Sequence, residues 1–396
     1  SIGSGHFSIQ GSMSNLQGPN SKPSQAPNRD PISYDHYASI VEKVERALQG
    51  GIVRVLFTDV DATLVLGAGH SESEIQQGQR DMRELIDTLN TRGFIIIPVT
   101  GSHLDSGTKT TNSILNRIDD GTLPGIGTHH QDRSYTVDAY VSDGGARAVK
   151  SVDGRSYVLD PIYSRGLSAL GCDYDALLNQ AVAQAHTVNQ QTLSPAELSI
   201  IAQYDKHATS ERMFLQPGTQ EGHHRHVNKV AFYFYATTLA QRDQIEANFR
   251  KLVEPLGLSV VCCEEKDATS AARRHPQVAP LVAKEEAPLK YCLDIVPFTK
   301  GSAVRYFSEY ISHLATELSI DRGVARPSIE IWACGDSGND QPLMALPLVS
   351  NVVIVGGASD ELIRYGDRLS VEGRSVFIER DPRRLGPASI AAAVRG

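Results

Sequence analysis

The chain has 396 residues, 40% of them hydrophobic, and a formal net charge of −8. Its length allows two domains with sizeable apolar cores, and the acidic balance without a basic, aromatic-rich stripe argues against nucleic acid as a partner. Because no stretch approaches about 18 uninterrupted apolar residues and no standard signal peptide is visible, we expect no membrane association and a cytoplasmic location.

Residues 1–32 differ in composition from the rest of the chain. They are rich in Ser, Gly, Asn, Gln and Pro and have almost no aliphatic periodicity, so they bury too little apolar surface to offset the entropy of ordering. We expect a disordered polar tail. A secretion or delivery signal read by dedicated machinery is the alternative interpretation of the same composition.

Helical and extended patterns alternate after the tail. Apolar residues at helical spacing, followed by Gly50 and Gly51, predict a first helix, and runs rich in Val, Ile and Phe predict strands. Such an alternation indicates an α/β fold with a Rossmann-like parallel sheet covered on both faces. In chain order we predict a helix over 34–48, a strand over 53–60, a helix over 72–93, a strand over 94–100, a helix over 301–318, and strands over 329–336, 351–357 and 375–380.

The middle of the chain is predicted to form a second unit. A strand over 229–237, a helix over 239–257 and a strand over 258–265 make a strand, helix, strand set that can form its own layers. We therefore expect an inserted α/β domain over 144–290. The main domain would then consist of residues 33–143 and 291–396.

The segment "VLFTDVDATLV", residues 55–65, is an apolar strand that ends in two aspartates. Buried carboxylates are costly unless something positive lies beside them. Residues two apart on a strand point the same way, so Asp59 and Asp61 can reach one pocket at the carboxyl end of the sheet, where open parallel sheets bind ligands. Taken alone, the pattern fits a strand-end turn with capping carboxylates equally well.

Three further segments place polar residues at predicted strand or helix ends. Thr100 and the amide of Gly101 are suited to hold an anion, and Lys300 begins a helix whose free N–H groups favour phosphate. Asp336 and Asp340 follow another strand. Each has a plain structural explanation by itself, as a cap, a solvated lysine or turn residues, whereas their shared order along the chain favours a phosphate and metal site.

These segments resemble the four motifs of the haloacid dehalogenase superfamily of phosphatases, at residues 59–63, Thr100, Lys300 and residues 335–340. The insertion between the second and third motifs is similar to the branch that carries an α/β cap there. Within that branch, "NKVAFYF", "LDIVPFTKGSAVRYF" and "CGDSGNDQPLM" resemble sucrose-phosphate phosphatases. The resemblance implies a Rossmann-like core with an inserted α/β cap domain over 144–290.

The resemblance also implies a reaction, the hydrolysis of a sugar phosphate such as sucrose 6-phosphate through an aspartyl-phosphate intermediate. Asp59 would be the nucleophile, and Asp61 would protonate the leaving alcohol and then activate water. Mg²⁺ would be bound by Asp59, the Asp61 carbonyl and Asp336, with Asp340 as a ligand or an orienting residue, since oxygen ligands suit this ion. The residues implied to bind the phosphate are Thr100, Gly101, Lys300 and Asn339.

Two segments bear on the choice of substrate. The second motif reads Thr-Gly-Ser-His where sugar-phosphate members commonly have Thr-Gly-Arg, so Ser102 and His103 are expected to alter substrate contacts. In the insertion, His224, His226 or Lys229 could bind a sugar or an anion, and zinc is a further candidate ligand, although adjacent histidines without a second cluster are more typical of a solvated loop.

Two alternatives to a phosphatase are open at the level of the sequence. A phosphosugar mutase would use the same Asp59 and Asp61, with a bisphosphate activator. A delivered effector or interaction protein would have kept the fold alone, although pure binding has no need for the Asp61 side chain.

Overall fold

The computed structural model describes residues 37–104, 113–127, 135–151, 157–160, 163, 170–217 and 229–396. The polar tail expected over 1–32 and the histidines His224 and His226 lie outside the described residues. Within the part of the chain that is described, no helix combines the length and the hydropathy needed to cross a membrane.

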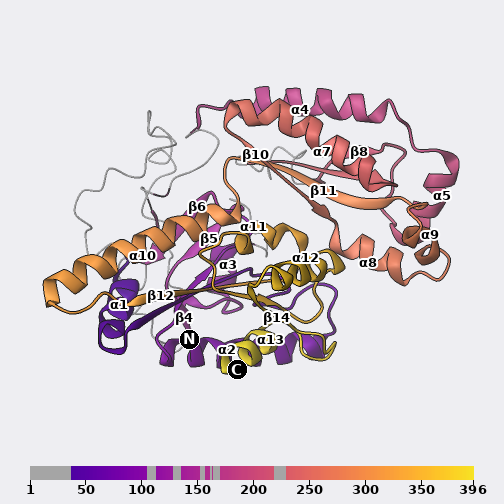
Figure 1. The fold of residues 1–396 in the computed structure, drawn as a ribbon. Coiled ribbons are helices and arrows are strands. Elements are labelled where there is room, and N and C mark those ends of the chain that lie inside the picture. Colours follow the sequence, from indigo (N-terminus) through magenta and orange to yellow (C-terminus); the bar gives the residue numbers. More distant parts are fainter. Residues whose placement is uncertain are drawn as a thin grey trace.

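A parallel sheet of five described strands forms the centre of the larger domain (Figure 1). The strand order is β14-β13-β12-β1-β2, and every neighbouring pair is parallel. The predicted α/β class with a parallel central sheet is confirmed. The strands are β1 (Ile52–Thr58), β2 (Ile95–Pro98), β12 (Ser328–Gly335), β13 (Asn351–Ile354) and β14 (Ser375–Ile378).

Alternation along β1 explains why helices cover both faces of this sheet. Val53, Val55 and Phe57 pack into one apolar cluster, whereas Leu56 packs into another on the opposite face. Figure 1 shows α1 and α10 on one side of the sheet and α2 and α13 on the other. The first face is covered by α1 (Ala38–Gly50), α10 (Lys300–Arg322), α11 (Gln341–Met344) and α12 (Asp360–Val371), and the second by α2 (Glu72–Thr91) and α13 (Pro387–Arg395).

Short elements extend the larger domain beyond β2. A bridge between Val99 and Val141 joins one of them to the segment that follows β2, and Val149 and Leu159 are buried in a core cluster. These elements therefore pack with the parallel sheet. They are α3 (Ile114–Asp119), β3 (Gly125–Ile126), β4 (Thr136–Val137), β5 (Tyr140–Ser142), β6 (Arg147–Ser151) and β7 (Tyr157–Leu159).

The smaller domain contains an antiparallel sheet with the strand order β10-β11-β9-β8. Phe232 and Phe234, on one face of β9, share an apolar cluster with Ala181 of α4 and Phe249 of α7. The predicted strand, helix and strand of this unit are present as β9, α7 and β10. Its elements are α4 (Tyr174–Asn189), α5 (Pro195–Tyr204), β8 (Met213–Leu215), β9 (Val230–Ala236), α7 (Leu239–Val253), η3 (Glu254–Leu256), β10 (Ser259–Glu264), α8 (Lys266–Arg274), α9 (Ala279–Ala283) and β11 (Leu289–Val296).

The packing places the domain boundaries elsewhere than the expected residues 144 and 290. β6 and β7 fall within the range 144–290. Ala148 of β6 and Tyr163, which follows β7, nevertheless pack into the core of the larger domain. β11 pairs with β9 and β10, so residues 291–296 belong to the smaller sheet. The apolar pattern of a segment predicts a strand but does not indicate which sheet that strand joins, and this is the reason for the difference.

Candidate active site

The first and fourth motif segments leave the sheet side by side. β1 and β12 pair in parallel, with Thr58 opposite Cys334, and the N–H of Asp59 donates to the Cys334 carbonyl at 2.9 Å. The chain then turns at Ala62, whose φ is 59° and whose N–H donates to the Val65 carbonyl at 2.7 Å. Parallel pairing therefore brings the residues after both strands to one edge of the sheet.

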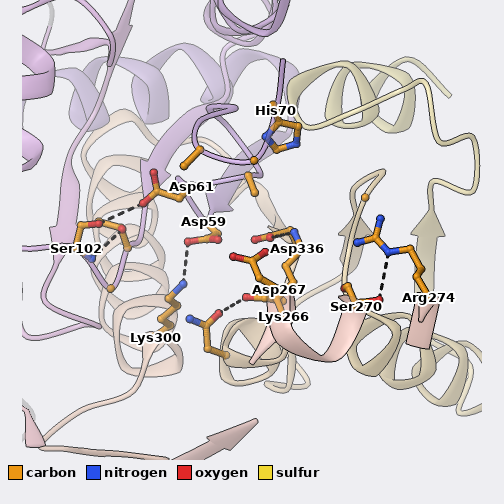
Figure 2. A pocket seen from close by; sticks show the side chains of 18 residues that line it. Asp59, Asp61, His70, Ser102, Lys266, Asp267, Ser270, Arg274, Lys300 and Asp336 are labelled. Carbon is orange, nitrogen blue, oxygen red and sulfur yellow. Dashed lines mark hydrogen bonds and ion pairs between the residues drawn. The ribbon is translucent and has the colours of Figure 1, made fainter. Parts of the chain in front are cut away.

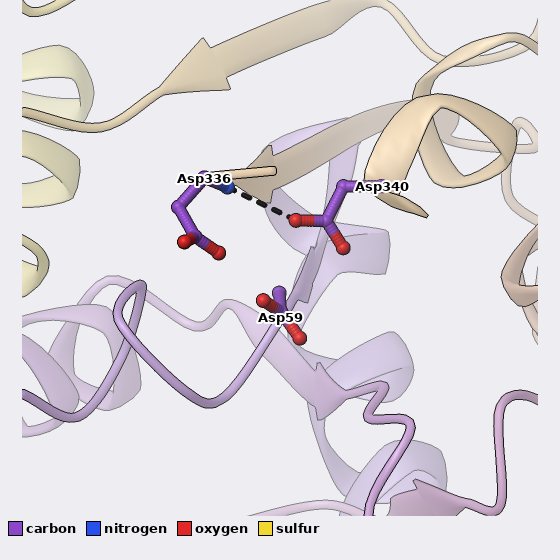
Figure 3. Close-up of side chains that lie close together, drawn as sticks. All are labelled: Asp59, Asp336 and Asp340. Atoms are coloured by element: carbon purple, nitrogen blue, oxygen red, sulfur yellow. Dashed lines mark hydrogen bonds between the residues drawn. The ribbon is translucent and has the colours of Figure 1, made fainter. Parts of the chain in front are cut away.

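Three carboxylates from these segments converge (Figure 3). One oxygen from each of Asp59, Asp336 and Asp340 lies within 4.8 Å of the others, and all three residues are buried. The Thr63 hydroxyl donates to Asp336 Oδ1 at 3.0 Å. Asp340 Oδ2 accepts from the N–H groups of Asp336 at 3.0 Å and Ser337 at 3.2 Å, so Asp340 holds the loop that carries Asp336.

Lys300 supplies a buried positive charge to this cluster. It is the first residue of α10, and its Nζ lies 2.9 Å from Asp59 Oδ1 and 2.7 Å from Asp340 Oδ1. Close packing holds the start of the helix, because a Cβ on Gly301 would lie 2.6 Å from the Pro342 carbonyl oxygen. The ammonium group is thereby fixed between the carboxylates that follow β1 and β12.

Burial dominates the electrostatics of these carboxyl groups. It raises the pKa of Asp59 to about 7, with Lys300 opposing the shift and Asp336 adding to it. Burial also raises the pKa of Asp340 to about 6, and Asp59 adds to that shift. Although burial lowers the pKa of Lys300, Asp340 and Asp59 raise it above its ordinary value, so the lysine stays charged. A further cation at the cluster would favour the ionised form of both carboxyls.

The donor set fits a hard divalent cation. Three buried carboxylates face two ammonium groups, that of Lys300 and that of Lys266, whose Nζ lies 2.5 Å from Asp336 Oδ2. Carboxylate oxygens without nitrogen or sulfur ligands suit Mg²⁺. A bound phosphate would add negative charge to the site. A cation at Asp59 and Asp336 would neutralise the negative charge that the two lysines do not balance.

Asp61 lies apart from the carboxylate cluster. Its side chain is 59% exposed and borders a cavity. Arg117 Nη2 lies 3.0 Å from Asp61 Oδ1, and the Ser102 hydroxyl donates to Oδ2 at 3.2 Å. The two aspartates of the first motif thus have different surroundings, since Asp59 is buried against a lysine and Asp61 is open to the cavity.

The predicted phosphate-binding residues border the same cavity. Thr100 is buried, and its hydroxyl accepts the N–H of Ser102 at 3.1 Å. Gly101 lines the cavity, and nothing lies within 4 Å of the point where a Cβ would stand. Asn339, in the 3₁₀ turn η4 (Gly338–Asp340), lines it as well. The predicted site residues are therefore brought together, since all of them except Asp340 line the cavity and Asp340 contacts Lys300, which does.

The cavity lies between the two domains and has a volume of about 600 Å³ (Figure 2). The larger domain supplies the motif residues, and α8 of the smaller domain supplies Lys266, Ser270 and Arg274 from the opposite side. The lining residues are Asp59, Asp61, Ala62, Ala68, Gly69, His70, Thr100, Gly101, Ser102, Lys266, Asp267, Ser270, Arg274, Lys300, Asp336, Ser337, Asn339 and Gly357.

Several residues at the site were not predicted from the sequence. No motif marks Arg117, because its approach to Asp61 depends on how α3 packs. The only sequence signal for Lys266 is its place directly after a predicted strand. Lys229, which was expected to be able to bind a sugar or an anion, lies 3.7 Å from Asp294 and is not among the described residues that line the cavity.

No protein-family model matches the chain, and no curated protein matches its sequence. Among solved structures, the chain is similar to a haloacid dehalogenase-like hydrolase from Bacillus subtilis, with 18% identity over 88% of this chain and 97% of that chain, at a TM-score of 0.39. It is also similar to a phosphatase of the haloalkanoate (HAD) enzyme superfamily from Bacteroides thetaiotaomicron, with 16% identity over 93% of this chain and 98% of that chain, at a TM-score of 0.40. A third is the C-terminal domain of trehalose-6-phosphate phosphatase from C. albicans, with 10% identity over 85% of this chain and 83% of that chain, at a TM-score of 0.36. These similarities are too distant to assign an activity, so the side chains of the site carry the inference of function.

Proposed function

We propose that the protein is a Mg²⁺-dependent phosphatase of the haloacid dehalogenase type that hydrolyses a sugar phosphate. The observation that carries the proposal is the placement of Asp59, Lys300 and Asp336 together at one sheet edge, with Asp61 on the border of the same cavity. A nucleophilic carboxylate, a cation for the phosphate and a proton carrier are the parts that phosphoryl transfer to a carboxylate requires.

Asp59 is the attacking group in this mechanism. Its Oδ1 contacts Lys300 at 2.9 Å and its Oδ2 lies 3.4 Å from the Thr63 hydroxyl, so the carboxylate is held at both oxygens. Attack of Asp59 on phosphorus forms the aspartyl-phosphate and breaks the P–O bond to the leaving alcohol, whose oxygen receives a proton from Asp61. Asp61 then takes a proton from the water that attacks the phosphorus, and inorganic phosphate and free Asp59 result.

The remaining groups stabilise charge. Lys300, Thr100 and Gly101 line the cavity, and the ammonium group, the hydroxyl and the N–H of these residues would interact with the oxygens of the transferring phosphoryl group. Asp59, the Asp61 carbonyl and Asp336 would hold Mg²⁺, with Asp340 orienting the loop. When bound, the ion neutralises the repulsion between the carboxylate nucleophile and the phosphate.

The cavity supports a small polar substrate. Its volume of about 600 Å³ falls within the usual range of about 300–1,000 Å³ for small-ligand sites. The lining contributed by α8 is polar and consists of Lys266, Asp267, Ser270 and Arg274; Ser270 and Arg274 could contact sugar hydroxyls or a further anionic group, whereas Lys266 is paired with Asp336. Sucrose 6-phosphate is the first compound to test because of the sequence resemblance.

A panel of sugar phosphates and simple phosphate esters, assayed for inorganic phosphate, tests the proposal. We expect release in the presence of Mg²⁺, loss of release after treatment with EDTA, and recovery when Mg²⁺ is restored. Isomerisation of a phosphosugar without release of phosphate would instead identify a mutase. No turnover of any compound with Mg²⁺ present would contradict an enzymatic role and favour an interaction protein.

A further inference from the structure

We infer that Arg117 is a positioning residue that sets the orientation of the Asp61 carboxylate, with Ser102 as its partner. The inference rests on the proposed function, in which Asp61 carries the proton. Arg117 Nη2 lies 3.0 Å from Asp61 Oδ1, and the Ser102 hydroxyl donates to Oδ2 at 3.2 Å. Each oxygen of the carboxylate thus has a partner of its own, an ion-paired guanidinium at Oδ1 and a hydroxyl donor at Oδ2, and together the two contacts orient the group.

The Arg117 side chain has little freedom. Only 10% of it is exposed. Ile114 and Ile118, on the same short helix α3, are buried in the core, and the Arg117 carbonyl accepts the N–H of Leu123 at 2.9 Å. A guanidinium carried on such a fixed segment is planar and keeps its charge in one position beside the carboxylate, which the ammonium of a flexible lysine does not.

Backbone hydrogen bonds join α3 to the segment that carries Ser102. The N–H of Ile114 donates to the His103 carbonyl at 3.0 Å, and the N–H of Leu115 donates to the Leu104 carbonyl at 3.1 Å. Arg117 and Ser102 therefore approach Asp61 from segments held in a fixed register. A shift of either segment would change both contacts to the carboxylate.

Folding stability alone does not explain this pair. The Asp61 side chain is 59% exposed, and an ion pair with an exposed partner contributes little to stability. The same exposure leaves the carboxylate open to the cavity, where Figure 2 shows Asp61 and Ser102 on one side. A side chain that must give and take a proton at one place gains from a fixed orientation, because misplacement slows the transfer.

The dependence of the rate on the leaving group tests this role. The value of kcat/KM reports the steps up to the aspartyl-phosphate, and p-nitrophenyl phosphate needs little protonation of its leaving group whereas an alkyl phosphate needs it. For Arg117→Met we expect a loss of about 10- to 100-fold with the alkyl phosphate and of less than about 3-fold with p-nitrophenyl phosphate. Arg117→Lys retains the positive charge and should fold. Its loss of kcat/KM with the alkyl phosphate should be smaller than that of Arg117→Met. The double variant Arg117→Met with Asp61→Asn should lose no more than Asp61→Asn alone.

Arg374→Met is the matched control. Arg374 donates to the carbonyls of Met344 at 3.0 Å and Val349 at 2.8 Å and is not among the described residues that line the cavity, so its loss should affect both substrates alike. An equal loss on both substrates in the Arg117 variants, or weaker inhibition by inorganic phosphate, would overturn the positioning role. Absence of phosphatase activity in the unmodified protein would instead refute the proposed function itself.

Discussion

Lys300 contacts two buried carboxylates at once, Asp59 and Asp340, and only 6% of its side chain is exposed. Charged groups in such a place are tolerated because each neutralises the other. The same geometry that stabilises the buried charges leaves the ammonium at the wall of the cavity. One residue therefore serves both the packing of the site and the binding of an anion.

Lys300→Met should separate these two effects. The variant leaves two carboxylates without their shared cation, so we expect the free energy of unfolding without added metal to fall by about 3–5 kcal/mol. Phosphate release should fall by about 10²- to 10³-fold, since a group that stabilises the transferring charge is lost. Urea unfolding and a phosphate-release assay measure the two quantities.

Lys43→Met provides the control for this variant. Lys43 is buried and lies 2.7 Å from Asp138, away from the described lining of the cavity. It should lose comparable stability and keep its turnover at a temperature where it is folded. If Lys300→Met also kept its turnover, the assignment of Lys300 to the phosphate would be wrong.

Whether a site residue can be predicted from the sequence depends on what brings it to the site, a regular element or the packing of distant segments. Asp59 and Asp336 were predicted because a parallel sheet brings the carboxyl ends of its strands to one edge, and Lys300 because a helix begins there. Arg117 could not be predicted, because its side chain reaches Asp61 only through the packing of α3. Lys266 comes from the other domain, and a single sequence carries no signal for that approach.

At the scale of elements, α12 of the larger domain and β10 of the smaller domain are joined by direct contacts. Glu361 Oε2 accepts the N–H of Glu264 at 2.7 Å, and Arg364 lies 3.2 Å from the Glu264 carboxylate. Gly338, in the turn between Asp336 and Asp340, lies against this junction. The position of the smaller domain is thereby coupled to the loop that carries the carboxylates.

Gly338→Ala tests that coupling. An added Cβ would lie 2.5 Å from Glu361 Oε1 and 2.7 Å from Cys263 Cβ, so the loop or β10 must shift, at a cost of about 1–3 kcal/mol for overpacking. We expect a lower melting temperature and a loss of about tenfold or more in kcat/KM, since a shift of about 1 Å at a site can cost up to 10²-fold. Gly67→Ala, where nothing lies within 4 Å of the new Cβ, should change neither quantity. Unchanged kinetics in Gly338→Ala would show that the junction does not influence the site.

The helices and strands themselves were predicted more fully than the pairing and packing between them. Apolar alternation and glycine positions were enough to predict β1, β12 and α10, because these patterns are local. The pairing of β11 with β9 and β10 depends on contacts between distant segments, and so do the positions of β6 and β7 in the larger domain. For that reason the expected limits 144 and 290 differ from the segments that pack with each sheet, while the strand, helix and strand of the smaller domain were predicted.

At the scale of the whole molecule, the cavity between the domains is lined by carboxylates and by lysines from both domains. The carboxylates are those of Asp59 and Asp336, while Lys300 comes from the larger domain and Lys266 from the smaller one. This distribution suits a bound cation and a phosphate together. Either ligand alone leaves part of the charge unbalanced.

Thermal unfolding with and without Mg²⁺ tests this distribution directly. A ligand that binds only the folded state at about 100 times its Kd stabilises it by about 2.7 kcal/mol, so Mg²⁺ should raise the melting temperature by several degrees. Asp336→Asn should remove most of this rise in melting temperature, because it replaces a buried carboxylate by a neutral amide. An Asp360→Asn control, on an exposed carboxylate of α12, should keep it. The same rise in Asp336→Asn as in the unmodified protein would place the ion elsewhere.

The most direct test of the central claim is detection of the aspartyl-phosphate. Asp61→Asn keeps the nucleophile but lacks the proton carrier, a role worth roughly 10² to 10⁴ in rate, so with p-nitrophenyl phosphate it should become phosphorylated and hydrolyse slowly. Rapid quench and mass spectrometry should then find a phosphorylated peptide that contains Asp59. The Asp59→Asn protein should show no such peptide and only background turnover. Undiminished turnover in Asp59→Asn, or a phosphoryl group on another residue, would contradict the assignment of Asp59 as the nucleophile.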